Sequence, residues 1–201
     1  GGAPAPARTD VRRIIRDAVI PAAVAISMAF VIQAAVAKPY EIPTGSMIPT
    51  IKEHDRIIAN RLIYRFRDIE RGDVIVFDPP RAAVEACDPP KGVPFVKRVI
   101  GLPGDVVEIR PKEVLVNGVP YVVDDAVKPN AVQDGLPRQT FPPVPEGHLL
   151  VLGDNRPSSC DSHQWRGDRP DPATDPFVPI ANVIGQAEVV YWPVTHLGFL
   201  S

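Results

Sequence analysis

Hydrophobic residues are spread unevenly along the chain, and one long apolar segment near the N-terminus stands apart from the rest. Residues 18–37 contain no charged side chain, and only Pro21, Ser27 and Gln33 interrupt the apolar run. A helix of this length spans about 30 Å, which is the thickness of the hydrocarbon core of a bilayer. The pattern therefore predicts a transmembrane anchor helix over 18–37.

The charges on either side of this segment predict its orientation. Four arginines precede it within residues 1–17, whereas a stretch of similar length after it holds only two lysines. By the positive-inside rule, residues 1–17 form a cytoplasmic tail of a single-pass cell-membrane protein, and residues 38–201 are extracytoplasmic. The sequence Ala-Val-Ala at 35–37 also has the form of a signal-peptide cleavage site, so removal of the segment as a secretory signal is the alternative.

The remaining sequence alternates short β-rich runs with turn residues. The runs lie at 56–66, 73–77, 95–100, 106–109, 114–116, 119–123, 148–152 and 183–191. Asn117-Gly118, between two of these runs, is the preferred pair for a type I′ hairpin turn. Insertions rich in Pro or acidic residues lie at 78–94, 124–147 and 166–179, and we interpret them as surface loops. The pattern predicts a mainly β fold, an antiparallel sheet domain over 38–201 with Pro-rich loops, preceded by one transmembrane helix.

Composition supports this fold class and narrows the range of functions. Pro accounts for 25 of the 201 residues, which disfavours a helical bundle because Pro breaks helix interiors. The net charge of −2 gives no electrostatic reason to expect nucleic acid as a partner. Cys87 and Cys160 are the only cysteines, and no spacing typical of a zinc site occurs, so we expect no metal and no cofactor. One disulfide between them is possible in an oxidising compartment, but the sequence does not give their separation.

Three polar segments carry candidate chemistry. They are Pro-Thr-Gly-Ser-Met at 43–47, a segment over 97–105 that begins Lys-Arg and ends Gly-Asp, and Gly-Asp-Asn-Arg-Pro-Ser-Ser-Cys-Asp-Ser at 153–162. Alone, each is typical of an ordinary turn or of a strand with a solvent-facing lysine. Together, in this order behind an apolar segment, they resemble the conserved boxes of bacterial type I signal peptidases, which are membrane-anchored serine proteases with a Ser/Lys dyad.

The resemblance implies roles for the first two segments. Ser46 matches the nucleophile of the family, and Lys97 matches the general base that accepts its proton. Thr44 matches a hydroxyl that forms the oxyanion hole together with the backbone amide of Ser46. The residues implied to line shallow apolar pockets for small substrate side chains are Tyr40, Ile42 and Val96.

The resemblance also implies a shell of supporting residues around the dyad. Ser159 matches a hydroxyl that orients the lysine amine, and Asp161 matches a nearby supporting acid. Arg98 and Asp154 match a salt bridge that braces the site. His163 departs from the pattern, because many members have arginine there, so the usual partner of Asp161 is altered.

A lysine acts as a base only when a sufficient fraction of it is neutral. Its ordinary pKa of about 10.4 must fall by roughly two units, and burial lowers a lysine pKa because desolvation disfavours the ammonium form. The apolar neighbours of Lys97, which include Val96 and Val99, are suited to this. A carboxylate in contact with the amine raises its pKa, so we predict that Asp161 does not contact Lys97 directly.

These inferences predict a membrane-anchored endopeptidase that removes signal peptides from exported preproteins by cleaving after small residues, at sites of the A-x-A type. Its expected partners are signal peptides and the lipid bilayer. One alternative is a specialised Ser/Lys processing peptidase with a narrow substrate range. The other is a non-catalytic, membrane-tethered β domain that binds an extracytoplasmic partner.

Overall fold

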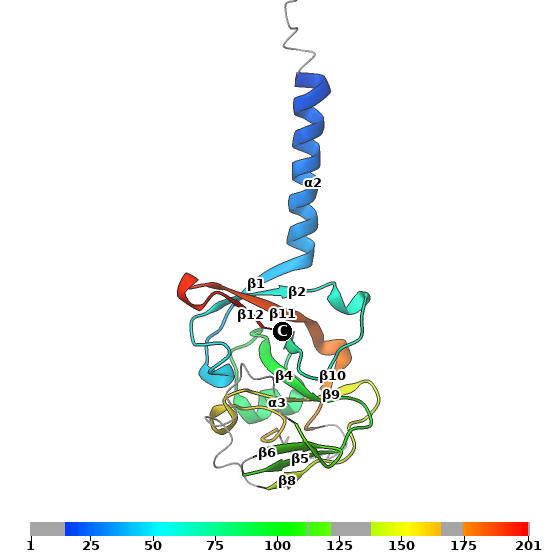
Figure 1. Ribbon diagram of the computed structural model, residues 1–201, viewed down its shortest axis with the longest axis vertical. Helices are drawn as coiled ribbons and strands as arrows, with labels where there is room; N and C mark the ends of the chain where they lie inside the picture. Colours follow the sequence, from blue (N-terminus) through cyan, green and yellow to red (C-terminus); the bar gives the residue numbers. More distant parts are fainter. Residues whose placement is uncertain (1–14, 112, 122–137, 166–174, 201) are drawn as a thin grey trace, which may run out of the picture. The chain divides into compact units, whose positions relative to one another are not determined.

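The structure is a computed structural model that describes residues 15–111, 113–121, 138–165 and 175–200 (Figure 1). The chain divides into two compact units, residues 1–37 and residues 38–201. The first unit contributes helical structure, and the second unit contains two β-sheets.

The first unit is helical over nearly all of the predicted segment, but its first residues are not α-helical. A π-helical turn, η1 (Ile15–Val19), leads into the 17-residue helix α2 (Ile20–Val36), and strand β1 (Ala37–Glu41) begins at the next residue. The 17 α-helical residues of α2 rise about 26 Å, which is less than the roughly 30 Å of a bilayer core. Among the described residues, no helix is both long and apolar enough to cross a membrane. The structure therefore does not support the transmembrane anchor predicted over 18–37, nor the single-pass placement that rested on it.

The larger sheet has eight strands, in the order β1–β2–β11–β3–β4–β9–β10, with β12 paired to β11. After β1, its strands are β2 (Arg56–Asn60), β3 (Val74–Phe77), β4 (Phe95–Gly101), β9 (His148–Leu152), β10 (Val178–Pro179), β11 (Val183–Trp192) and β12 (Gly198–Phe199). The long strand β11 pairs antiparallel with β3 along its first half and with β2 along its second half (Figure 1). Strand β4 lies between β3 and β9, and both pairings are antiparallel, so β4 is an interior strand. The antiparallel β domain predicted from the sequence is confirmed.

A smaller antiparallel sheet has the order β7–β6–β5–β8. Its strands are β5 (Val107–Arg110), β6 (Glu113–Val116), β7 (Val119–Pro120) and β8 (Gln139–Thr140). Asn117 and Gly118 connect β6 to β7 with φ angles of 53° and 79°. Positive φ at both central residues defines a type I′ turn, so the predicted hairpin is confirmed.

Four local predictions are wrong. The run at 56–66 is a strand only as far as Asn60, and it ends in the 3₁₀ turn η3 (Ile63–Arg65). The segment 78–94, interpreted as a loop, contains helix α3 (Arg81–Cys87), which begins directly after Pro80. This helix of seven residues is too short to give a periodic pattern, although Ala82 and Ala83 on it are buried in the core. The segments 124–147 and 166–179, interpreted as surface loops, contain strands β8 and β10, and each buries a phenylalanine in the core, Phe141 and Phe177. The rest of these two segments, residues 124–137 and 166–174, and residues 122–123 of the run at 119–123 lie outside the described residues.

The core holds the site-bearing segments in place. Met47 and Ile51, which follow the candidate nucleophile, are fully buried in a cluster with residues of β2 and β3. Ile100 belongs to a second cluster, with the smaller sheet, and Val99 belongs to a third. Neighbouring residues of β4 thus pack into different clusters, which fixes this strand firmly. The remaining short 3₁₀ turns are η2 (Gly45–Met47), η4 (Arg156–Ser158), η5 (Ile180–Asn182) and η6 (Val194–His196).

Candidate active site

Ser46 lies in the turn η2, between β1 and β2. Asn155 holds this turn from the opposite segment, because its backbone N donates to Ser46 O (3.0 Å) and its Nδ2 donates to Gly45 O (2.9 Å). Met47, the next residue, is fully buried. The backbone that carries the Ser46 hydroxyl is therefore held by contacts on both sides of the residue.

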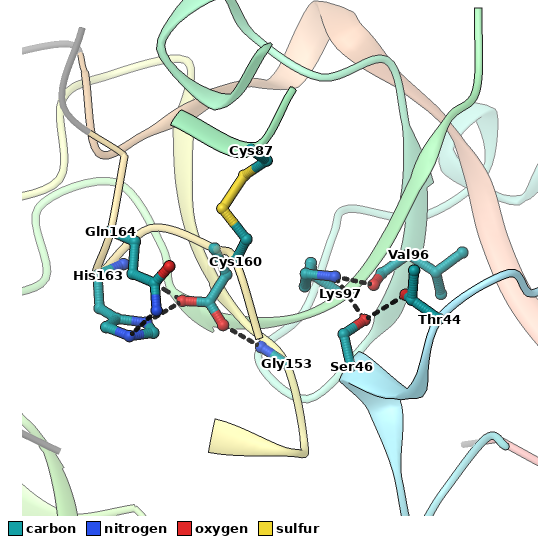
Figure 2. Close-up of a disulfide and its surroundings, with 10 residues drawn as sticks. Thr44, Ser46, Cys87, Val96, Lys97, Gly153, Cys160, His163 and Gln164 are labelled. Atoms are coloured by element: carbon teal, nitrogen blue, oxygen red, sulfur yellow. Dashed lines mark hydrogen bonds and ion pairs between the residues drawn. A yellow bond between two sulfur atoms is a disulfide. The ribbon is translucent and has the colours of Figure 1, made fainter. Parts of the chain in front are cut away.

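Lys97 lies on β4, opposite Ile75 of β3, and only 5% of its surface is exposed. Its Nζ is 2.8 Å from Ser46 Oγ and 3.0 Å from the carbonyl oxygen of Val96 (Figure 2). The ammonium form donates to both oxygens, and the neutral amine can accept a hydrogen bond from the Ser46 hydroxyl. The predicted pair of nucleophile and base is thus brought within hydrogen-bond distance by segments 51 positions apart in the sequence.

The electrostatic surroundings of Lys97 favour its neutral form. Burial lowers the pKa of the Lys97 amine from its ordinary 10.5 to about 8, because the interior desolvates the ammonium ion. The negative charges of Asp161 and Asp154 act in the opposite direction and raise this pKa. Burial is the larger effect, so near pH 8 about half of the amine is neutral.

Thr44 lies on the other side of the Ser46 hydroxyl from Lys97 (Figure 2). Its Oγ1 is 3.4 Å from Ser46 Oγ, which is a long contact for two hydroxyl groups. Thr44 is thus close enough to the nucleophile to donate to an oxygen bound there.

The supporting residues differ from the predicted arrangement at one point. Ser159 is buried, but its hydroxyl has no hydrogen-bond partner among the described residues and does not orient the amine. Its Oγ packs against Gly153, where an added Cβ would come within 2.2 Å of it, and the carbonyl of Val96 holds Lys97 Nζ instead. Asp161 accepts from Gly153 N at 2.7 Å, and it is not among the hydrogen-bond partners of Lys97 in the described structure, as predicted.

Arg98 and Asp154 form a buried bidentate ion pair. Arg98 Nε donates to Asp154 Oδ1 (2.8 Å), and Nη2 donates to Oδ2 (2.7 Å). Thr50 also donates to Oδ2, and Arg98 Nη1 donates to Gly72 O at 2.7 Å. The pair joins β4, which carries Lys97, to the segment that carries Asn155, so it ties together the two segments that position the dyad.

A groove of about 320 Å³ opens beside the dyad. The three predicted pocket residues line it together with the dyad and Thr44: Tyr40, Ile42 and Val96. The end of α3 and the segment after it form a further part of its lining, through residues 87–90 and 93–94. Most of these side chains are apolar, so the groove suits small or apolar groups next to the Ser46 hydroxyl.

Comparison with known proteins shows to which family the chain belongs. The sequence model of the family described as "Signal peptidase, peptidase S26" matches residues 15–192. The chain belongs to this family. A protein named signal peptidase I from Leptolyngbya laminosa is 39% identical over 176 residues, which cover 88% of this chain and 79% of that protein.

Other relatives have related names. A probable thylakoidal processing peptidase 2 of Arabidopsis thaliana is 36% identical, over 84% of this chain and 42% of the longer protein. The chain is also similar to a signal peptidase I from Enterococcus faecalis of known crystal structure. The sequences are 32% identical, and the structures match with a TM-score of 0.44 over 60% of this chain and 97% of the Enterococcus chain. Membership of the signal peptidase family makes the chain a serine endopeptidase.

Several functional contacts were not predicted from the sequence. The clamp of Asn155 on the Ser46 turn and the bond from Lys97 to Val96 O both involve backbone atoms, which are present at every position and leave no sequence signal. The wall formed by Cys87 and the residues after it lies in the segment interpreted as a loop. Only its cysteine carried a signal, through a possible disulfide with Cys160.

That disulfide is formed in the structure. Cys87, at the end of α3, is bonded to Cys160, which lies beside Ser159, and both cysteines line the groove (Figure 2). The bond joins residues 73 positions apart and so restricts the unfolded chain strongly. It also attaches the groove wall to the segment behind the dyad.

Replacing both cysteines is expected to affect stability and substrate binding more than chemistry. The double variant Cys87→Ser/Cys160→Ser should lose about 2–5 kcal/mol of unfolding free energy. Its KM should rise more than its kcat falls, because the groove wall is released while Ser46 and Lys97 keep their supports. Denaturant unfolding and steady-state kinetics measure both effects, and the wild type treated with a reductant should match the variant. Unchanged stability and an unchanged KM contradict this assignment.

Proposed function

We propose that this chain removes signal peptides from exported preproteins, cleaving after small side chains, with Ser46 as nucleophile and Lys97 as general base. The observation that carries the proposal is the 2.8 Å contact between Ser46 Oγ and a buried lysine amine whose pKa is lowered to about 8. A serine hydroxyl is a weak nucleophile until a neighbouring base accepts its proton. A neutral amine in this position supplies that base.

The first half of the reaction forms an acyl-enzyme. Lys97 Nζ accepts the proton of Ser46 Oγ, and Oγ attacks the carbonyl carbon of the scissile peptide bond. The carbonyl oxygen becomes an oxyanion, which accepts hydrogen bonds from the Thr44 hydroxyl and the Ser46 backbone amide. When the tetrahedral intermediate collapses, the C–N bond breaks, and the Lys97 ammonium gives its proton to the leaving amine.

The second half releases the signal peptide. A water molecule takes the place of the departed amine, and Lys97, again neutral, accepts a proton from it. The hydroxide attacks the ester carbon, the same two donors bind the oxyanion, and Ser46 Oγ leaves with the proton held by Lys97. Both halves require one amine to change protonation state repeatedly, which a lysine with an ordinary pKa does poorly near neutral pH.

The groove supports the choice of substrate. Tyr40, Ile42 and Val96 line it with apolar surface beside Ser46, and none of them supplies a charge for a polar substrate side chain. Small residues such as Ala suit shallow apolar pockets, and A-x-A sites are typical of signal-peptide cleavage.

Incubation of the purified protein with precursors that carry A-x-A sites tests the proposal. We expect a single cut after the second Ala, located by mass spectrometry, and loss of cleavage when either Ala is replaced by Lys. Cleavage of only one precursor from a varied panel indicates a specialised processing peptidase instead. No cleavage of any precursor by folded protein contradicts the proposal.

The Thr44 hydroxyl is expected to contribute to the oxyanion hole. Thr44→Val removes the donor and keeps the shape of the side chain, so kcat should fall about 10²–10³-fold, with KM little changed. Thr44→Ser retains the hydroxyl and should keep most of the activity. Steady-state kinetics on one precursor separate these results. Equal losses in the two variants assign Thr44 to packing rather than to oxyanion binding.

A further inference from the structure

His163 and Asp161 form a buried pair next to the dyad, and the mechanism above does not use it. Their side chains are only 7% and 0% exposed. Asp161 Oδ1 lies 2.6 Å from His163 Nδ1 and 3.2 Å from the backbone N of the same residue (Figure 2). Gln164 Nε2, a donor, lies 3.1 Å from His163 Nε2. Because His163 Nε2 accepts there, the proton of the neutral ring is on Nδ1, which donates to Asp161.

The other oxygen of Asp161 acts on the segment behind the nucleophile. Asp161 Oδ2 accepts from Gly153 N at 2.7 Å. Gly153 is packed so tightly that an added Cβ would lie 2.4 Å from Ser46 O and 2.2 Å from Ser159 Oγ. The carboxylate thus holds the backbone that packs directly against the carbonyl of Ser46.

The same carboxylate also affects the protonation of Lys97. The negative charge of Asp161 raises the pKa of Lys97 and opposes the effect of burial. Within the described residues, the other charged groups that act on this carboxylate or on Lys97 include Asp154, which acts on Lys97 in the same direction, and the buried Arg156, which interacts favourably with both acids. A hydrogen bond to Asp161 from the side away from Lys97 draws negative charge off the carboxylate and reduces this opposition.

We propose that His163 is a positioning residue that holds the Asp161 carboxylate on Gly153 and draws its negative charge away from the Lys97 amine. The inference rests on the proposed role of Lys97 as general base. His163 touches no reacting atom, and it acts on the dyad only through Asp161. It differs from a purely structural residue because it sets the pH range in which the base works.

Three variants test this inference through the pH at which Lys97 titrates. His163→Ala removes the donor, so the pH of half-maximal cleavage should rise by roughly half a unit to one unit. His163→Asn keeps an N–H donor at the position of Nδ1 and should restore the wild-type midpoint. Asp161→Asn removes the opposing charge and should shift the midpoint in the opposite direction, to lower pH. His148→Ala, which removes a histidine at the start of β9 away from the dyad, is the matched control and should leave the midpoint unchanged.

Two measurements allow the role of His163 to be tested separately from the proposed function. The first is the pH profile of single-turnover cleavage, and the second is titration of the Lys97 amine by NMR with isotope-labelled lysine, which needs no substrate. A folded His163→Ala variant whose Lys97 midpoint equals that of the wild type overturns the inference. So does an Asp161→Asn variant with an unshifted midpoint, which carries the test if His163→Ala does not fold. Failure of the wild type to cleave any precursor counts against the proposed function, while the NMR shifts still decide the role of His163.

Discussion

Replacing Lys97 with methionine is expected to lower kcat for precursor cleavage by about 10⁴-fold or more, because it removes the base that activates Ser46. Methionine is close to the lysine side chain in length and shape and has no proton acceptor of comparable strength. KM should change little, since the groove lined by Tyr40 and Ile42 is untouched. Single-turnover cleavage of one precursor measures the loss.

The same variant is expected to remain folded. The pKa of Lys97 is about 8 in the folded protein and about 10.5 in the unfolded chain, so the unfolded chain binds more protons between these pH values. Stability of the wild type therefore rises with pH across this window, and below pH 8 the buried ammonium costs about 3 kcal/mol. Methionine has no such cost, so Lys97→Met should be at least as stable as the wild type below pH 8.

An exposed lysine provides the control for this prediction. Lys52 is solvent-exposed and its amine contacts His196, outside the residues that line the groove. Lys52→Met should cleave at the wild-type rate. Retention of most activity by Lys97→Met, in protein shown to be folded, refutes the assignment of Lys97 as the base.

Asp154→Ala is expected to have the largest effect on stability, with a loss of about 3–5 kcal/mol of unfolding free energy. It leaves the guanidinium of Arg98, which is 5% exposed, buried without its two charge-assisted hydrogen bonds. Thr50 also loses its acceptor. Denaturant unfolding at pH 7 measures the loss, and activity should fall as well because β4 is no longer tied to the segment that clamps Ser46.

A second ion pair shows how much of this effect depends on burial. Glu108 is paired with Arg110 at the surface of the smaller sheet, with both side chains partly exposed. Glu108→Ala should change the unfolding free energy far less than Asp154→Ala, because water solvates the arginine that remains. Equal effects of the two substitutions contradict the view that the Arg98–Asp154 pair braces the site through its burial.

The β framework followed from the sequence because its physical causes are local. Apolar β-rich runs placed strands such as β9 and β11 to within about one residue, and Asn117-Gly118 placed the hairpin turn. The apolar pattern did not predict that the N-terminal helical segment begins as the π-helical turn η1, because an uncharged apolar run does not fix where α-helical hydrogen bonding begins. It also missed α3, whose buried alanines are recognisable only once the residues packed against them are known.

The site was predictable as a set of side chains but not as a set of contacts. The motifs identified Ser46, Lys97 and the Arg98–Asp154 pair, and the structure brings each pair together. The predicted hydrogen-bond partner of the amine is wrong. The carbonyl of Val96 accepts from Lys97 Nζ where the hydroxyl of Ser159 was expected. Which oxygen reaches the amine depends on backbone positions that meet only in the folded chain.

Direct titration of the Lys97 amine in the wild-type protein, by NMR with isotope-labelled lysine, tests the central claim. Loss of the resonance in Lys97→Met assigns it. We expect this amine to lose its proton with a midpoint near pH 8, while exposed lysines titrate near their ordinary values. A Lys97 midpoint near 10.5 means that the amine is charged at working pH, and it contradicts the proposal that this residue activates Ser46.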